Sequence, residues 1–192
     1  LEVMPALGKV DAVVTDPPYG IGFAAQPTKW QRLAGKKPKE WDNFVSKAVL
    51  NLPDMSVDCM IWGGNYYSLP VTRGWLSWYK PDAPPSMGNF ELCWTNRNAN
   101  ARQISCSISA TNPERVGHPT QKPLAVMQWC LGFLPNAETI LVACAKLGRK
   151  GIGVELDEDY FEIACKRVQA AYDQPDLFVA PPTPPTQEGM DL

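Results

Sequence analysis

The sequence is poor in histidine and lacks paired cysteine motifs, and both shortages exclude classes of site. His118 is the only histidine among 192 residues, so we expect neither a histidine-based zinc site nor a Ser-His-Asp triad. None of the six cysteines belongs to a Cys-x-x-Cys pair, and we interpret them as reduced, mostly buried thiols of a cytoplasmic protein. They are Cys59, Cys93, Cys106, Cys130, Cys144 and Cys165.

Long apolar runs and an excess of charge are also absent. No segment approaches the roughly 18 apolar residues of a membrane span, and none has the pattern of a secretory signal. The formal net charge of -2 gives no global basic field for nucleic acid, although a local basic groove stays open. Because the chain begins at Leu1 rather than at Met, we expect a further N-terminal piece to precede it.

The composition that is present fits a single α/β domain. Apolar residues make up 45% of the chain and charged residues 20%, which is ordinary for a globular protein of this length. Segments of strand type alternate with helical segments, a pattern that predicts a parallel sheet. We expect a domain over residues 1–172 and a Pro-rich, disordered tail over residues 173–192.

Several elements can be placed from local pattern. A helix over 44–55 is expected to end at Pro53, and another over 123–134 to have Pro123 as its first residue. A hairpin between Trp75 and Trp94 is expected to add antiparallel strands at one edge of the sheet. Residues 97–123 read as an irregular connector or a small recognition element. Further strands are expected at 57–62, 138–140 and 150–157, and further helices at 141–148 and 158–174.

The stretch "DAVVTDPPYG", residues 11–20, combines a buried strand with a rigid loop. Ala12 to Val14 are typical of a buried strand. Two prolines then remove backbone donors and stiffen the chain. The loop would present Asp16 and Tyr19 at the carboxyl end of the strand, where open α/β sheets bind their ligands. An ordinary strand-to-turn transition is the alternative.

Two other segments carry charges that could serve a site. Glu155 ends the apolar stretch "GIGVEL", and an acid at such a strand end can bind a ribose, or simply cap the next helix. A basic segment leaves directly from the Asp-Pro-Pro-Tyr turn, and it is either a solvated surface or a phosphate contact. Its basic residues are Lys29, Arg32, Lys36, Lys37 and Lys39.

Taken in order, these motifs resemble the amino-methyltransferases that modify exocyclic amines of DNA bases. "DPPYG" resembles the catalytic motif of that family, "GHPTQKP" its segment beside S-adenosylmethionine (SAM), and residues 147–168 its second cofactor strand and helix. The resemblance covers most of residues 9–170. The order, catalytic motif first, is similar to the permuted class called beta, and the compact middle and tail resemble phage or prophage members.

The resemblance implies a Rossmann-like, SAM-dependent methyltransferase sheet with a small target-recognition insert over about residues 80–117. Asp16 would accept an N–H from the base amine, helped by the Pro17 carbonyl, while Pro18 stiffens the loop. Tyr19 would stack on a base rotated out of the duplex. The chain lacks the Pro-Cys dipeptide of cytosine-C5 enzymes, as befits a direct methyl transfer. Asp before the prolines favours adenine N6 over cytosine N4.

For the cofactor, the resemblance implies that Glu155 binds the ribose hydroxyls and that Thr120, Lys122 and Pro123 flank the SAM pocket. His118 would be structural. Double-stranded DNA is the expected partner, with the basic segment on its phosphates. The resemblance leaves open a homodimer and a restriction partner, and it implies no membrane association.

One part of the family pattern is missing. The family has a glycine-rich cofactor loop after the strand that begins "ETI", whereas here Ile140 is followed directly by Leu141. Such a loop lets the backbone approach a cofactor at a helix N-terminus. Its absence leaves three hypotheses: an adenine-N6 DNA methyltransferase, an inactive DNA-binding remnant of one, or a cytosine-N4, RNA or protein methyltransferase. The last two substrates are less favoured, because their families prefer Asn-Pro-Pro-Tyr.

Overall fold

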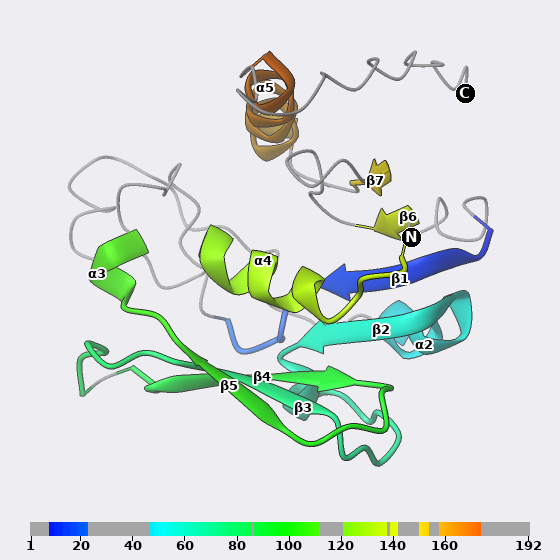
Figure 1. Cartoon of the computed structure of the whole chain (residues 1–192). Coiled ribbons are helices and arrows are strands. Elements are labelled where there is room, and N and C mark those ends of the chain that lie inside the picture. Colours follow the sequence, from blue (N-terminus) through cyan, green and yellow to red (C-terminus); the bar gives the residue numbers. More distant parts are fainter. Residues whose placement is uncertain are drawn as a thin grey trace.

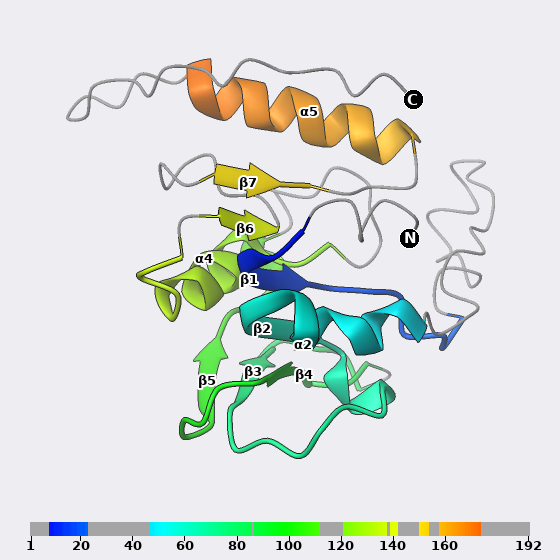
Figure 2. The ribbon, with the colours of Figure 1, turned by 90° about the vertical axis from the view of Figure 1, so that its right-hand side faces the viewer.

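The computed structural model describes residues 8–22, 47–85, 87–111, 121–137, 139–141, 150–153 and 158–173. Within these ranges the chain builds one seven-stranded sheet in the order β5-β3-β4-β2-β1-β6-β7. Figure 1 shows the sheet with helix α4 beside it, and Figure 2 shows α2 against β1 and β2 in the view turned by 90°.

Four neighbouring strands run parallel and form one half of the sheet. β1 pairs with β2 on one side and with β6 on the other, and β6 pairs with β7. The expected parallel sheet is therefore confirmed for this half. The strands are β1 (Val10–Thr15), β2 (Ser56–Trp62), β6 (Thr139–Leu141) and β7 (Lys150–Ile152).

The other half contains the one reversed strand of the described sheet. β4 (Phe90–Thr95) is antiparallel to both β2 and β3 (Trp75–Tyr79), so the expected hairpin is confirmed. The hairpin does not form the edge, however, because β5 (Arg102–Ser105) adds in parallel outside β3. The reversed direction of β4 places its first residues at the same edge of the sheet as the last residues of β1, β2 and β3.

The sheet is covered on both faces, and alternation along the central strands supplies both cores. Ala12 and Val14 of β1 pack with Val126 and Cys130 of α4 (Leu124–Gly132). Val13 faces the other way and packs with Leu52, the first residue of α2 (Leu52–Met55). The short 3-10 helix η3 (Lys47–Asn51) leads into α2, and η4 (Gly64–Tyr66) follows β2.

Three local expectations were wrong. Pro53 does not end a helix but lies in the first turn of α2, where its missing N–H costs nothing. Pro123 is the residue before α4 rather than its first helical residue. The stretch 97–123 is not wholly irregular, because it contains β5 and the short helix α3 (Ile108–Thr111).

The C-terminal part matches the expected pattern of elements. Helix α5 (Glu158–Asp173) forms over the expected range, but Phe161 and Val168 are half exposed, so its apolar stripe is not covered by described residues. β6 continues across the junction of Ile140 and Leu141 without interruption. The helix expected over 141–148 is wrong at its first residue, because Leu141 is the last residue of β6, and residues 142–148 lie outside the described residues. The expected tail also lies outside them, apart from Asp173, which ends α5.

Candidate active site

Acidic and basic side chains from four segments meet where β1 and β2 end and β4 begins. Asp16 follows the last residue of β1, and Glu91 is the second residue of β4. Lys122 stands two positions before α4, the helix that packs on this part of the sheet. The carboxyl ends of parallel strands are the usual ligand-binding edge of such sheets.

Lys122 connects the Asp-Pro-Pro-Tyr loop to β4. Its Nζ donates to Asp16 Oδ2 at 2.9 Å, to the Tyr19 hydroxyl at 3.0 Å and to Glu91 Oε2 at 2.8 Å. These contacts use all three N–H bonds of the ammonium group. The Lys122 side chain is only 7% exposed, so it is a buried cation held between two carboxylates.

The pattern of alternating charge extends one step further. Lys80, which follows β3, donates from Nζ to Glu91 Oε1 at 2.9 Å, and its side chain is also buried. The register explains the contact, because Trp78 and Glu91 are direct partners across β3 and β4. We call this array of Asp16, Lys122, Glu91 and Lys80 the charge chain. Two acids and two bases make it neutral overall.

The charge chain shifts the ionisation of its members. Burial tends to lower the pKa of Lys122, but the carboxylates of Asp16 and Glu91 outweigh it and raise that pKa. Burial tends to raise the pKa of Glu91, but Lys122 and Lys80 outweigh it and lower that pKa. Both groups are therefore charged throughout the neutral pH range.

Tyr19 is fixed by its hydroxyl and by its ring. The hydroxyl donates to Asp16 Oδ1 at 2.6 Å while it accepts from Lys122. Burial and the nearby negative charge of Asp16 and Glu91 raise the Tyr19 pKa strongly, so the phenol stays protonated. The ring stacks on Tyr66 of η4, with 5.0 Å between centroids and 18° between planes.

Gly63 makes room for the Tyr19 ring. It has a φ of 67°, a left-handed conformation that favours glycine. A Cβ at this position would collide with ring atoms Cδ1, Cε1 and Cζ of Tyr19. The loop is also tied to the residue after η4, because the Tyr67 hydroxyl donates to the Pro18 carbonyl. The strand thus ends just before Gly63, as expected, and the Asp-Pro-Pro-Tyr loop packs against this glycine.

The buried cysteines are structural rather than nucleophilic. Cys59, Cys93 and Cys130 are buried and form no disulfide, as expected, while Cys165 is exposed. Burial raises the pKa of Cys59 and of Cys130 to about 12, so neither is a thiolate at neutral pH. Among the described residues no group of histidine, cysteine or acidic side chains could hold a metal ion.

The structure brings together only some of the residues singled out from the sequence. Asp16, Tyr19 and Lys122 meet, with Pro17 and Pro18 in the same loop. Lys122 contacts Asp16 directly, and its place beside a SAM pocket stays a prediction. The remaining candidates lie outside the described residues: Thr120, Glu155, His118, Lys29, Arg32, Lys36, Lys37 and Lys39.

Sequence reasoning missed Glu91, Lys80 and Tyr66. Glu91 had a usable signal, since it is the one acid in the otherwise apolar strand "FELCW", and a buried acid needs a partner. Lys80 had none, because a lysine after a strand is usually solvated.

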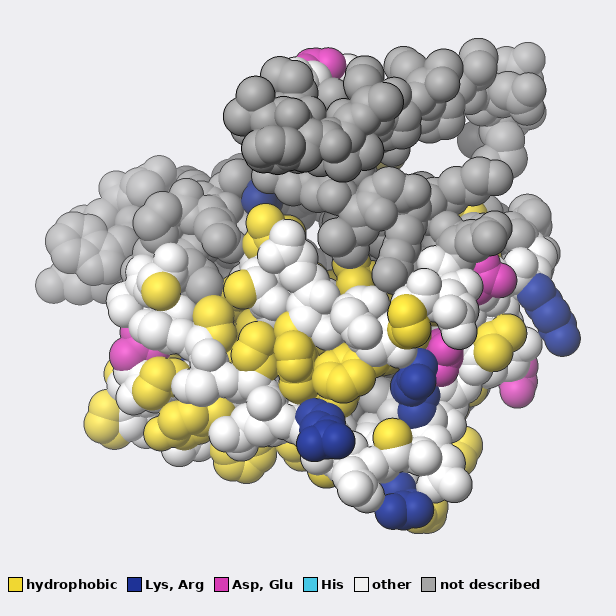
Figure 3. All heavy atoms as spheres, in the orientation of Figure 1, with side chains coloured by type: hydrophobic (Ala, Val, Ile, Leu, Met, Phe, Trp, Pro, Cys, Tyr) yellow, Lys and Arg dark blue, Asp and Glu magenta, His cyan; other side chains and the backbone are white. Residues whose placement is uncertain are grey.

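The described Lys and Arg side chains are scattered on the face shown in Figure 3, so these residues form no basic surface there.

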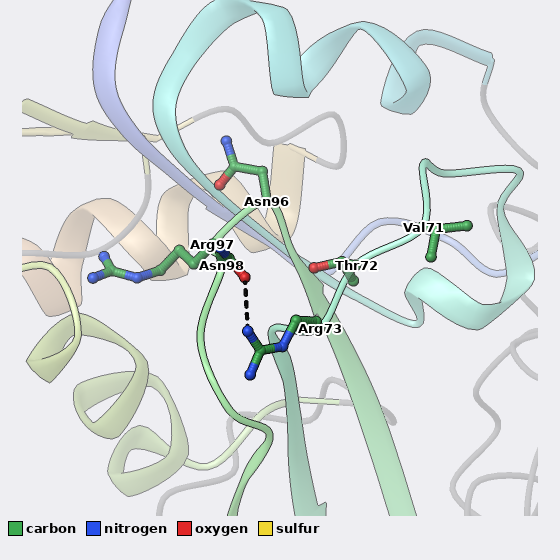
Figure 4. Close-up of a pocket in the computed structure, with 6 residues that line it drawn as sticks. All are labelled: Val71, Thr72, Arg73, Asn96, Arg97 and Asn98. Carbon is green, nitrogen blue, oxygen red and sulfur yellow. Dashed lines mark hydrogen bonds between the residues drawn. The ribbon is translucent and has the colours of Figure 1, made fainter.

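A cavity of about 270 Å³ lies at the opposite edge of the sheet, beyond the end of β4 (Figure 4). Arg73 donates to the side-chain oxygens of Asn98 and Asn100. Arg97 donates to Asp58 and to the Phe133 carbonyl. These polar groups form hydrogen bonds with protein partners, so we interpret the cavity as a space between packed loops and not as a ligand site. Its lining residues are Val71, Thr72, Arg73, Asn96, Arg97 and Asn98.

Comparison with known proteins finds this architecture among solved structures. No family model and no curated protein matches the chain. The crystal structure of the M1.HpyAVI–SAM complex matches with a TM-score of 0.54 and 22% identity, over 86% of this chain and 92% of that chain. The two proteins share a fold. The expected Rossmann-like α/β class is thereby confirmed. No described helix is long and apolar enough to cross a bilayer.

Proposed function

We propose that this chain is a site-specific DNA methyltransferase that transfers a methyl group from SAM to an exocyclic base amine, with adenine N6 as the target. The observation that supports it most is the Asp16 carboxylate, held at a strand end by hydrogen bonds from Tyr19 and Lys122. The fold shared with M1.HpyAVI, which was solved as a complex with SAM, adds support.

The chemistry of the target explains the residue types. An exocyclic amine is a poor nucleophile, because its lone pair is delocalised into the ring. A carboxylate that accepts one N–H favours a pyramidal nitrogen and frees the lone pair, and Asp16 would do this with help from the Pro17 carbonyl. Tyr19 would stack on the extruded base. The two prolines hold these groups in place, and such positioning supplies much of the rate of a direct transfer.

SAM would supply the methyl group, and Glu155, Thr120, Lys122 and Pro123 are the residues expected to hold it. Thr120 and Glu155 lie outside the described ranges. Lys122 commits its ammonium group to Asp16, Glu91 and Tyr19. Pro123 begins α4. The roles assigned to this chain are therefore limited to binding and orienting the base.

The link between β6 and β7 favours a second candidate function, in which the chain binds an extruded base without methylating it. These adjacent strands are parallel, and only residues 142–149 connect them. Parallel neighbours normally need a crossover of about a dozen residues or more. The short link coincides with the absent glycine-rich loop, so we expect weak or no SAM binding if the chain is tested as it stands.

A transfer assay with tritiated SAM and mixed-sequence duplex DNA separates the two candidates. Methyltransferase activity predicts label in the DNA, loss of label in Asp16→Ala, and retention in Asp58→Asn, which changes an acid at the opposite edge. Digestion to nucleosides identifies the methylated base, and RNA and protein substrates run in parallel. The base-binding candidate is supported if no label reaches the DNA, DNA still binds, and calorimetry detects no heat of SAM binding. Absence of both label and DNA binding refutes both.

The expected DNA contacts give an independent check on the partner. Lys29, Arg32, Lys36, Lys37 and Lys39 would neutralise backbone phosphates, so affinity for duplex DNA should fall steeply with salt. Replacing all five with glutamine should flatten this salt dependence. An unchanged salt slope would remove the basic segment from the interface.

A further inference from the structure

We propose that Lys122 recognises the ring nitrogen next to the exocyclic amine, so that the site accepts adenine or cytosine and rejects guanine and thymine. The proposal rests on the proposed function, because it assumes that an extruded base reaches Asp16. It assigns to Lys122 a role in base recognition instead of the cofactor contact expected from its motif.

The base-free site contains a stand-in for such a base. The Tyr19 hydroxyl is a donor to Asp16 Oδ1 at 2.6 Å and an acceptor from Lys122 Nζ at 3.0 Å. The hydroxyl oxygen therefore bonds to both an acceptor, the Asp16 carboxylate, and a donor, the Lys122 ammonium. These two groups lie side by side, because the other carboxylate oxygen, Asp16 Oδ2, is 2.9 Å from Lys122 Nζ. A group that replaces the hydroxyl must offer one donor and one acceptor close together, and two neighbouring atoms can supply them.

Adenine and cytosine carry that pair of atoms on their Watson–Crick edges. The amine of each is a donor, and the adjacent ring nitrogen, N1 of adenine or N3 of cytosine, is an unprotonated acceptor. Guanine and thymine present the reverse, a carbonyl oxygen beside a ring N–H. When the exocyclic group of guanine or thymine occupies the place of the amine at Asp16, a carbonyl faces the carboxylate and a ring N–H faces the Lys122 ammonium. Enzymes that extrude bases read this edge by hydrogen bonds.

The surroundings of Lys122 keep its donor in place. Glu91 also accepts from the ammonium group, and Lys80 in turn donates to Glu91. The Lys122 side chain is 7% exposed, so water competes little for its N–H bonds. Nζ also lies 5.4 Å from the centre of the buried Trp62 ring, which limits its movement. Once the Tyr19 hydroxyl leaves, the ring is free to stack on the incoming base.

The test uses DNA hairpins that contain one unpaired base between randomised flanks, because the recognition sequence is not needed to present such a base. Binding is measured by fluorescence anisotropy for unpaired adenine, 1-deazaadenine, in which C–H replaces N1, and thymine. We expect adenine to bind about tenfold more tightly than 1-deazaadenine, the effect of one hydrogen bond from a charged donor. Thymine should bind more weakly than adenine.

Two lysine variants locate the effect. Lys122→Met should bring the ratio of adenine to 1-deazaadenine affinity close to one. Lys80→Met is the matched control, because Lys80 is also buried on Glu91 but does not contact Asp16, and it should keep the ratio. Equal binding of the two purines by the natural chain, or an unchanged ratio in Lys122→Met, overturns the proposal while DNA binding itself survives. Failure to bind any hairpin refutes the proposed function and the inference together.

A tyrosine variant keeps the proposal testable if Lys122→Met does not fold. Tyr19→Phe keeps the ring but removes the hydroxyl that occupies the place of the base. We expect its affinity for unpaired adenine to rise severalfold while the preference over 1-deazaadenine persists. An affinity that is unchanged or lower, or a lost preference, contradicts the stand-in role of the hydroxyl.

Discussion

Oppositely charged side chains pair both where β1 to β3 end, here called the Asp16 edge, and where these strands begin, here called the opposite edge. The basic side chains are buried to different extents at the two places. At the edge that carries Asp16, the side chains of Lys122 and Lys80 are 7% and 5% exposed. At the opposite edge, Arg97 and Asp58 are 36% and 29% exposed. The acids are exposed to similar extents, 26% for Asp16, 27% for Glu91 and 29% for Asp58, so the contrast lies in the basic side chains, and solvent screens Arg97 more than Lys122 or Lys80. Buried charges of this kind are costly to retain without a function, which favours the Asp16 edge as the site.

The largest expected effect is the loss of the buried cation. Lys122→Met leaves Asp16 and Glu91 facing each other without Lys122 between them, and we expect the free energy of unfolding to fall by about 3–5 kcal/mol. Urea denaturation followed by tryptophan fluorescence measures it. A cost below 1 kcal/mol would erase the contrast between the two edges.

A close approach of glycine to a neighbour occurs at both edges, and only one should matter for binding. Gly63→Ala combines a left-handed φ with a collision with Tyr19, and we expect a loss of about 2–3 kcal/mol of unfolding free energy. Gly74→Ala, where a Cβ would meet the Arg97 carbonyl, should also destabilise. Only Gly63→Ala should weaken binding to unpaired adenine. Equal weakening by both variants would show that binding merely follows stability.

The pH dependence of stability should come from the buried edge. The lowered pKa of Glu91 means that its contribution is present above about pH 4.3 and is lost as the pH falls through the folded-state value. The raised pKa of Lys122 means that its contribution is present below about pH 10.4 and is lost as the pH rises further.

Glu91→Gln tests the acid side of this profile. We expect it to cost about 2 kcal/mol at pH 7 and progressively less towards pH 3, because the natural chain loses the same interaction on protonation. Urea unfolding between pH 3 and pH 7 gives the comparison. A cost that is the same at every pH would exclude Glu91 from the acid limb.

The smallest effect is expected at the exposed edge. Arg97→Met removes an ion pair that solvent screens, and it should cost about 1 kcal/mol or less. The hydrogen bond to the Phe133 carbonyl accounts for part of that figure. The cost of Arg97→Met should be smaller at high salt, because salt screens exposed ion pairs, and binding to unpaired adenine should not change. A cost equal to that of Lys122→Met would refute the distinction between the edges.

The sequence predicted the central strands and half of the site because both leave local signals. β1 to β4 are short apolar runs that end at glycine, proline or polar residues, and Asp16 and Tyr19 lie in a motif of unusual stiffness. The position of the β3–β4 hairpin could not be predicted, because pairing of β4 with β2 depends on long-range contacts. Polar, largely exposed β5 has no apolar alternation to reveal it. Glu91 joins the site only through the reversed direction of β4.

The charge chain draws its members from residues 16, 80, 91 and 122, so it can assemble only after β1, the β3–β4 hairpin and the start of α4 have all docked. A small molecule that bridges Asp16 and Lys122 would therefore bind the completed domain and no partly folded form. By mass action such a compound should raise the melting temperature of the whole sheet. A thermal-shift screen of free nucleobases could then find ligands of the charge chain without any knowledge of a DNA sequence.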